Sequence, residues 1–389
     1  MNETLYKQAS DKFKQHYGID HTATAYAPGR VEVLGNHTDY NEGLVLSAAI
    51  NMGIYCLAAP SSDNTCRIVA GDLMQEASFD LEDKSVDPDN MWANYIKGVF
   101  VKLRELKSEN INQAFNLLFF SNVPLGAGLS SSAALEISSG LCFSSLYDVS
   151  VPKLDMALIG QASEHDYADV MCGVMDQISS IFGKLNHLVK SDFRTLQVET
   201  EPLGEKLCFL ICDTNAKHAL ADGVYNKRRQ KCEDAAAYFA TVLDHHVSAL
   251  RDVTMTEWQK HQANMDPLAA KRSAHIIGEN ERVTQGAELL KKGDAEAFGK
   301  LMFQSHQSSI ENFDNSCEEL DFIVKNAHNI PGILGARLSG GGFGGSVVVL
   351  VHPRDIETVT QAIKFPYEKH FNIKCDIRTI IPSAGATIV

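Results

Sequence analysis

The sequence predicts a two-domain protein of the α+β class, and three observations support this prediction. The chain has 389 residues, more than a single hydrophobic core usually accommodates. The segment "KLCFLICDT", residues 206–214, has the apolar pattern of a buried strand and follows the turn-like "EPLGE". Beyond it the chain reads as strand, helices, strand, helix and strand, which fits an α+β arrangement better than a doubly wound sheet. We therefore expect domains at residues 1–205 and 206–389.

Several segments predict individual elements. Residues 61–90 are polar and irregular, which indicates hairpins and loops. "AFNLLFF", residues 114–120, is a strand candidate, and residues 130–147 are a helix candidate. Residues 253–313 have helical periodicity with a break expected at Gly293 and Asp294, and "SVVVLV", residues 346–351, is a further strand candidate.

Composition and charge exclude some functions. The formal net charge of −14 argues against a surface for nucleic acid or for anionic membranes. No apolar run has the length that a bilayer requires, and the first residues, "MNETLYKQASDKFKQ", contain no apolar signal core. The nine cysteines are scattered without a C-x-x-C pair, as expected of reduced thiols. These features predict a cytoplasmic protein that binds neither nucleic acid nor membrane.

The segment "PLGAGLSSSAALE", Pro124 to Glu136, places small residues between a strand candidate and a helix candidate. Small residues let backbone N–H groups approach a ligand closely, and the first N–H groups of a helix lack partners. A phosphate satisfies those groups and meets the positive end of the helix dipole, while serine hydroxyls suit a phosphate or Mg²⁺. A helix cap after a glycine-rich turn has the same composition, so the segment alone leaves both interpretations open.

Other phosphate-binding motifs are absent or misplaced. The sequence has no G-x-x-x-x-G-K-[ST] and no H-R-D or D-F-G pair. "GGGFGG", Gly340 to Gly345, matches G-x-G-x-x-G, but a strand pattern follows it where a dinucleotide fingerprint needs a helix. It is either a tight turn between strands or a backbone segment that packs against the phosphate loop.

Two more segments carry candidate chemistry. "YAPGRVEVLGNHTDYNEGLVL", Tyr26 to Leu46, spaces polar side chains closely enough to bind the hydroxyls of a polyol such as a sugar, although a polar surface turn would look similar. In "CGVMDQISS", Cys172 to Ser180, Asp176 stands at a predicted helix start, where it is either a helix cap or a catalytic group.

Taken together, these motifs resemble the galactokinase branch of the GHMP kinase superfamily. "APGRVEVLGNHTDYNEG" resembles the galactokinase signature, "PLGAGLSSSAALE" the superfamily's phosphate loop and "LSGGGFGGSVV" its C-terminal glycine motif. "WANYIKGV", "EHDYADVMCGVMDQ", "VYNKRRQKCE" and "GDAEAFGKLMFQSH" also resemble galactokinase segments in the same order. The resemblance covers nearly the whole chain.

The resemblance implies a fold and a reaction. The expected N-terminal domain is similar to the second domain of ribosomal protein S5, the expected C-terminal domain is ferredoxin-like, and the active site lies between them. The implied reaction transfers the γ-phosphoryl group of ATP to the C1 hydroxyl of α-D-galactose. The implied partners are therefore a small-molecule sugar and ATP with Mg²⁺, and the sequence gives no sign of an obligatory protein partner.

The resemblance also implies roles for single residues. Asp176 would accept the proton of the C1 hydroxyl, and Arg30 would stabilise charge on the nucleophile and on the transferring group. A neighbouring guanidinium favours the charged form of a carboxyl group, so we expect Asp176 to be ionised at neutral pH. Ser132 and Glu164 match the family's magnesium ligands. The phosphate loop would comprise Gly126, Ala127, Gly128, Leu129, Ser130, Ser131 and Ser132, and the sugar contacts Asn36, His37, Asp39, Gly173 and Tyr225.

This sequence departs from the family pattern at three positions. The signature usually reads R-V-N-[LI]-[IV]-G-E-H-T-D-Y, and here Glu32 stands where Asn is usual and Asn36 where Glu is usual. The usual Glu contributes to binding the C6 hydroxyl of the sugar. Asp169 also occupies a place where Gly is usual. Alternatives are therefore a kinase for N-acetylgalactosamine, galacturonate or arabinose, and a non-catalytic galactose sensor, although the intact "GLSSSAA" with Arg30 and Asp176 favours an enzyme.

Overall fold

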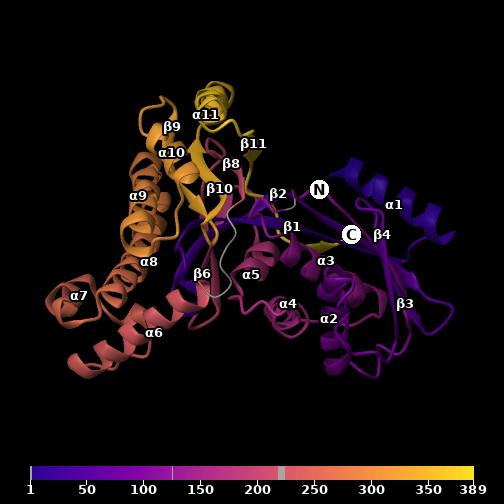
Figure 1. Ribbon diagram of the computed structural model, residues 1–389. Helices are drawn as coiled ribbons and strands as arrows, with labels where there is room; N and C mark the ends of the chain where they lie inside the picture. The colour runs from indigo at the N-terminus through magenta and orange to yellow at the C-terminus, as the bar shows by residue number, and fades with distance from the viewer. Residues whose placement is uncertain (1, 125, 218–223) are drawn as a thin grey trace.

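The computed structural model describes residues 2–124, 126–217 and 224–389, in which two β-sheets carry most of the core (Figure 1). The described part of the first sheet has eight strands in the order β12-β1-β2-β5-β3-β4, with β6 on β2 and β7 on β6. Among the described strands of this sheet, only the β3–β5 pairing is parallel. The strands are β1 (Ala23–Leu34), β2 (Leu44–Pro60), β3 (Thr65–Ala70), β4 (Gln75–Asp80), β5 (Phe115–Ser121), β6 (His187–Asp192), β7 (Gln197–Pro202) and β12 (Thr387–Ile388).

Helices cover both faces of this sheet because side chains alternate along its strands. On β2, Ile54 and Cys56 point into the main core, whereas Tyr55 and Leu57 pack against Phe13 of α1 on the opposite face. The main-core face is covered by α3, which packs on β1 and β2, and by α2 and α4, which pack on α3. The helices of this half are α1 (Glu3–Tyr17), α2 (Met91–Leu106), α3 (Ser131–Leu146), α4 (Lys153–Tyr167) and α5 (Met175–Phe182).

The second sheet is antiparallel and has the order β11-β8-β10-β9. Val347 and Val349 of β10 face α10 and α11, whereas Val348 and Leu350 join the main core of the first sheet. The two halves of the chain therefore share one continuous core. The elements are β8 (Cys208–Lys217), β9 (Ile333–Ser339), β10 (Gly344–Val351), β11 (Asp376–Ile380), α10 (Glu318–Ala327) and α11 (Ile356–Phe371).

A helical region lies between β8 and β9 of the second sheet in the sequence, packs against strands of both sheets and extends to one side of the molecule (Figure 1). Helix α8 is capped by Asp266 and ends at Gly293, whose φ of 72° is the left-handed conformation that glycine adopts readily. The helices are α6 (Val224–Val242), α7 (Met255–His261), α8 (Pro267–Lys292) and α9 (Ala295–Ser308). Short helical turns are η1 (Asp39–Asn41), η2 (Leu250–Asp252), η3 (Gln262–Asn264), η4 (Ser309–Phe313) and η5 (Pro353–Asp355).

Most of the predicted elements are confirmed. The hairpin in residues 61–90 is β3–β4, the strand candidates are β5, β8 and β10, and the helix candidate at 130–147 is α3. The break at Gly293 and Asp294 separates α8 from α9. The domain limits at residues 205 and 206 remain a prediction. Strand β12, from the second half of the chain, returns to the first sheet, where Ile388 pairs with Ala25.

Within the described ranges, no helix combines the length and the apolar character that crossing a membrane requires.

A cluster of ion pairs fastens the loop after β1 to the helical region. Arg194 pairs with Glu42 and with Asp252, at N–O distances of 2.6 Å each. Arg251 donates to both carboxylate oxygens of Asp192, at 2.6 and 3.0 Å, and to the backbone carbonyl of Glu42 at 2.7 Å. The loop after β1 contains the candidate residues 36–39, and this cluster fastens its far end at Glu42.

We expect Arg251→Met to lower the free energy of unfolding by about 1–3 kcal/mol at neutral pH, since it removes charged hydrogen bonds. Burial on its own would raise the pKa of Asp192, but Arg251 and nearby backbone N–H groups lower it to about 2. A carboxyl group with a depressed pKa stabilises the fold above its unfolded pKa of about 4, and that stability is lost as the pH falls towards 2.

Urea unfolding of both proteins at pH 7 and at steps from pH 4 downwards checks this expectation. The difference between wild type and variant should shrink as the pH falls, whereas a constant difference would contradict the assignment. Arg229→Met is a matched control, because the Arg229–Glu233 pair is exposed and should contribute little.

Candidate active site

Arg30 and Asp176 form a bidentate ion pair between β1 and the first turn of α5. Arg30 Nε donates to Asp176 Oδ1 at 2.7 Å, and Nη2 donates to Oδ2 at 2.8 Å. Arg30 Nη1 also donates to the carbonyl of Gly128 at 2.7 Å. Burial on its own would lower the pKa of Arg30, but the charge and hydrogen bonds of Asp176 hold it above its ordinary value. The guanidinium is therefore a fixed cation next to a carboxylate whose side chain is 26% exposed.

The backbone of β1 touches the Gly126–Ser132 loop. The N–H of Arg30 donates to the carbonyl of Leu129 at 3.1 Å. A Cβ at Gly29 would lie 2.5 Å from the same carbonyl oxygen, so only glycine permits this approach. The sequence thus places Arg30 directly beside the loop.

The Gly126–Ser132 loop presents glycines outward and apolar side chains inward. Gly126 and Gly128 have positive φ values of 75° and 70°, and a Cβ built on either one would meet no atom closer than 4.0 Å. Ala127 and Leu129 are both 2% exposed, so their side chains anchor the loop in the core and only their backbone can reach a ligand. The loop therefore leaves open space above its backbone, as a phosphate site requires.

Ser130 does not act as a helix cap. Its hydroxyl donates to Asp176 Oδ2, and it makes no capping hydrogen bond to α3. The N–H groups in the first turn of α3, which begins at Ser131, consequently remain available to an anion. This observation favours the phosphate interpretation of the segment over the interpretation as a simple capped turn.

The "GGGFGG" segment forms a turn between β9 and β10, and the residue that follows it contacts this loop. The hydroxyl of Ser346 donates to the carbonyl of Ala127 at 2.8 Å. The Ser339 hydroxyl likewise donates to the carbonyl of Glu32 on β1 at 3.1 Å. The interpretation as a turn between strands is thus confirmed, and the residues on either side of the turn contact the loop and β1.

Ser132, at the start of α3, and Glu164, in the last turn of α4, lie within hydrogen-bonding reach of each other. Burial raises the pKa of Glu164, while hydrogen bonds with Cys172 and Ser132 oppose that rise. A hydroxyl and a carboxylate are oxygen donors that suit Mg²⁺, which usually takes one or two carboxylates and completes its shell with phosphate and water. Across the described ranges no group of three or more metal-binding side chains occurs. The pair therefore fits a magnesium ion held partly by a nucleotide.

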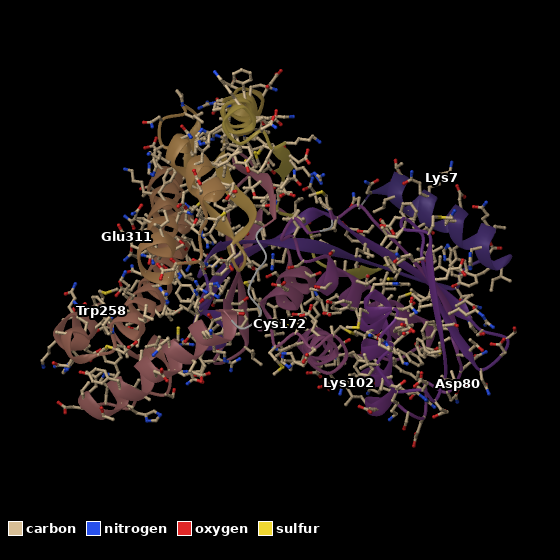
Figure 2. All side chains as sticks on the ribbon, in the orientation of Figure 1. Lys7, Asp80, Lys102, Cys172, Trp258 and Glu311 are labelled. Atoms are coloured by element: carbon tan, nitrogen blue, oxygen red, sulfur yellow. The ribbon has the colours of Figure 1, made fainter. Side chains whose placement is uncertain are left out.

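A polar pocket of about 140 Å³ opens beside the ion pair. It lies between β1, the segment before α5 and the β9–β10 turn. Figure 2 shows Cys172 near the centre of the view, between the two halves of the molecule. The pocket is lined by Arg30, Glu32, Asn36, His37, Asp39, Cys172, Gly173, Met175, Asp176, Gly340 and Gly341.

The structure brings most of the predicted catalytic and sugar-contact residues to this pocket. Arg30, Asn36, His37, Asp39, Gly173 and Asp176 all line it. Tyr225 belongs to the first turn of α6, but its side chain lies outside the described part of the chain.

Burial sets the protonation of two pocket residues. It raises the pKa of Asp39 to about 7, and the charges of Glu32 and Asp176 contribute to the rise. It lowers the pKa of His37 to about 4. His37 is therefore neutral near pH 7, and its Nδ1 lies 3.0 Å from the hydroxyl of Tyr40.

The three residues that depart from the family pattern lie in different surroundings. Glu32 and Asn36 face each other in the pocket, where Asn36 Nδ2 donates to Glu32 Oε1 at 2.9 Å. Asp169 is exposed, has a φ of 56° and does not line the pocket. Aspartate tolerates this left-handed conformation better than most residues other than glycine, so Asp169 serves the turn after α4 and adds no charge to the pocket.

Several residues of the site were not predicted. Arg337 pairs with Glu32 at 2.8 Å, Asn315 Nδ2 donates to Asn36 Oδ1 at 2.9 Å, and Glu279 accepts from the backbone N–H of Asn36 at 2.8 Å. Arg337 stands three residues before the glycine turn, so its position in the motif was a usable signal. Asn315 and Glu279 carry no sequence signal, because they reach the pocket only through tertiary packing.

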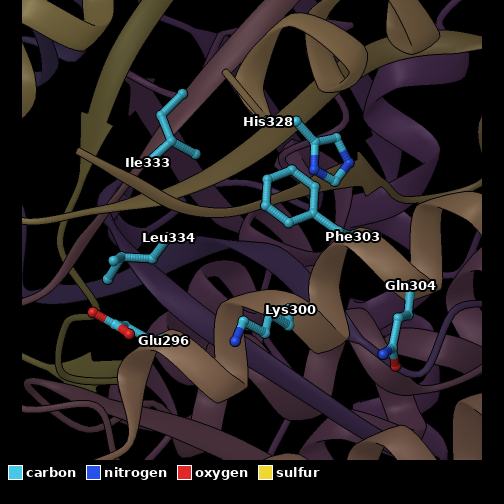
Figure 3. Close-up of a pocket in the computed structure, with 7 residues that line it drawn as sticks. All are labelled: Glu296, Lys300, Phe303, Gln304, His328, Ile333 and Leu334. Atoms are coloured by element: carbon cyan, nitrogen blue, oxygen red, sulfur yellow. The ribbon is translucent and has the colours of Figure 1, made fainter. Parts of the chain in front are cut away.

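A larger cavity of about 520 Å³ lies away from these residues, against α9 and the start of β9 (Figure 3). Phe303 stacks on His328 there, with ring centroids 3.8 Å apart. None of the predicted site residues lines it. The polar pocket therefore remains the candidate active site, although it is the smaller of the two cavities.

The fold is that of a GHMP kinase. Family models described as GHMP kinases N terminal domain and GHMP kinases C terminal match residues 94–184 and 287–369. Mevalonate kinase superimposes with a TM-score of 0.65 at 17% identity over 93% of this chain and 100% of that chain, which supports the fold alone.

More specific matches identify the branch of the GHMP kinases to which the chain belongs. The galactokinase galactose-binding signature matches residues 11–60. The galactokinase of Haemophilus influenzae is 38% identical over 97% of both chains, and that of Actinobacillus pleuropneumoniae is 40% identical over 94% of both. The Lactococcus lactis galactokinase complexed with galactose superimposes with a TM-score of 0.91, at 30% identity over 98% of this chain and 99% of that one. The chain belongs to the galactokinase family. These matches do not favour the sensor or the other aldose kinases.

We expect Gly173→Ala to weaken binding in the polar pocket. A Cβ at this position would lie 2.0 Å from Asp39 Oδ2, so the Asp39 side chain must move away. Losing a hydrogen bond that a sugar hydroxyl would donate to Asp39 should raise the KM for galactose by about tenfold. Steady-state kinetics with galactose and ATP varied separately check this, and a larger change in the KM for ATP would contradict it.

Proposed function

We propose that this protein transfers the γ-phosphoryl group of ATP to the C1 hydroxyl of α-D-galactose, which yields galactose 1-phosphate and ADP. ATP is the phosphoryl donor throughout this family. The observation that carries the proposal is the Arg30–Asp176 pair, which stands between a small polar pocket and an open phosphate loop. The relatives named galactokinase, at 38–40% identity over nearly their whole length, support galactose as the acceptor.

Asp176 binds the C1 hydroxyl and accepts its proton. Its Oδ2 already accepts hydrogen bonds from Arg30 and Ser130, whereas among the described residues Oδ1 accepts only from Arg30 Nε. A carboxylate oxygen has two acceptor directions, so Oδ1 retains one for the substrate. A carboxylate is a weak base, which is sufficient where the transition state is loose and positioning provides most of the rate enhancement.

Arg30 and the Gly126–Ser132 loop stabilise the transferring group. Arg30 is held by Asp176 and by the Gly128 carbonyl, so its charge is already oriented before substrate binds. The N–H groups at the start of α3 face the phosphates. Ser132 and Glu164 would hold Mg²⁺, which in kinases neutralises charge on the β- and γ-phosphate oxygens.

The polar pocket binds the rest of the sugar. His37, neutral near pH 7, and Asp39 supply hydrogen-bonding groups, and Gly173 leaves room beside Asp39. We further propose that the enzyme works in the cytoplasm, because none of its nine cysteines forms a disulfide. Independence from a protein partner remains a prediction.

The substrate is tested by measuring ADP release with galactose, N-acetylgalactosamine, galacturonate and arabinose. Galactose should give the highest kcat/KM, and another sugar that exceeds it would overturn the proposal. In the same assay Asp176→Asn should lower kcat by about 10²–10⁴-fold, as expected for loss of a general base. Calorimetry should show that the variant still binds ATP and galactose.

A variant at Asp176 that retains more than about a tenth of the wild-type rate would exclude its role as the base. Asp169→Asn is the matched control, since it makes the same change at an exposed residue whose left-handed conformation asparagine also tolerates. It should have wild-type kinetics.

We expect Glu164→Gln to shift the magnesium dependence of the rate to higher concentrations, because an amide is a poorer ligand than a carboxylate for a hard cation. The binding of galactose without nucleotide should remain unchanged. Asp166→Asn serves as the control, because its carboxylate is exposed and pairs with Lys102. Superimposable magnesium titrations of wild type and Glu164→Gln would show that Glu164 is not a ligand.

A further inference from the structure

Glu32 is a pocket carboxylate that the proposed mechanism does not use. Its side chain is 4% exposed, and its Oε1 accepts hydrogen bonds from Arg337 Nη1 at 2.8 Å and from Asn36 Nδ2 at 2.9 Å. Its Oε2 accepts no hydrogen bond from any residue in the described ranges. Glu32 lines the polar pocket, so this buried carboxylate has one unoccupied acceptor that a ligand can reach.

Asn36, by contrast, has no donor left for a ligand. One Nδ2 hydrogen binds Glu32 Oε1, and the other binds the carbonyl of Gly340 at 2.8 Å. Its Oδ1 accepts from Asn315 Nδ2 at 2.9 Å. An asparagine amide has only two donor hydrogens, so Asn36 positions Glu32 and the β9–β10 turn instead of donating to a ligand.

The position of Glu32 on β1 indicates which part of the sugar it meets. Arg30 and Glu32 are two residues apart in a regular stretch of the β1–β2 ladder, where they pair with Ala49 and Ser47. They therefore point to the same side of the strand, about 6.5 Å apart. Arg30 and Asp176 hold the end of the pocket where C1 reacts, so Glu32 faces the end of the sugar remote from C1.

We propose that Glu32 is a specificity-determining residue, whose Oε2 accepts a hydrogen bond from the C4 or the C6 hydroxyl of the sugar. This inference rests on the proposed function. Arg337 compensates the charge of Glu32, and Asn36 fixes its orientation. A sugar without the contacted hydroxyl would leave a buried carboxylate oxygen without a partner, which is how such pockets reject deoxy analogues.

The test measures kcat/KM for galactose, 4-deoxygalactose and 6-deoxygalactose in wild type and in Glu32→Gln. In wild type, one analogue should have a kcat/KM at least about tenfold lower than that of galactose. Which analogue this is shows whether Glu32 contacts the C4 or the C6 hydroxyl. In Glu32→Gln, Arg337 and Asn36 keep the amide oxygen in the Oε1 position and the NH₂ group replaces Oε2. The discrimination against that analogue should then weaken by about threefold or more, because a charged acceptor has become a neutral donor.

Asp169→Asn is the control and should keep the wild-type ratio, because this residue lies outside the pocket. Both analogues matching galactose in wild type would overturn the assignment without any variant, and so would a folded Glu32→Gln with unchanged discrimination. Should Glu32→Gln fail to fold, Glu32→Asp replaces it, since it retains the charge but withdraws the carboxylate from the pocket. Failure of wild type to phosphorylate galactose at all would instead refute the proposed function.

Discussion

The bidentate contact between Arg30 and Asp176 is the interaction on which the rest of the site depends. A buried guanidinium is costly unless it is paired and hydrogen-bonded, and here Asp176 and the carbonyl of Gly128 satisfy it. This requirement brings together β1, the first turn of α5 and the Gly126–Ser132 loop. The same requirement leaves Ser130 bound to Asp176 instead of capping α3, and so keeps the helix N-terminus open for phosphate.

The pocket is stable because both halves of the chain build it on one shared core. Val348 and Leu350 of the second sheet pack with Leu34 of β1 and Leu46 of β2. Hydrogen bonds then cross between the halves at the site itself, from Ser346 to the loop carbonyl of Ala127 and from Arg337 to Glu32. A pocket formed in this way is largely organised before the substrate arrives, which is what a reaction dominated by positioning needs.

The sequence predicted the fold class and most of the pocket, because local signals carried that information. Gly126 and Gly128 have the positive φ values that make glycine informative, and Arg30, His37 and Asp39 lie in one short motif. Asn315, Glu279 and the return of β12 to β1 could not be predicted, since each depends on contacts between distant segments. The exposed position of Asp169 also needed the structure, because the sequence does not show where a turn residue points.

The most direct test of the account follows the oxygen at C1. Galactose labelled with ¹⁸O at the C1 hydroxyl is incubated with ATP and the enzyme, and the product is examined by ³¹P NMR and mass spectrometry. Galactose 1-phosphate should form with the label retained in the bridging position, because direct attack of the C1 hydroxyl on the γ-phosphorus leaves the C1–O bond intact. Phosphate on another carbon, or loss of the label from the product, would contradict it.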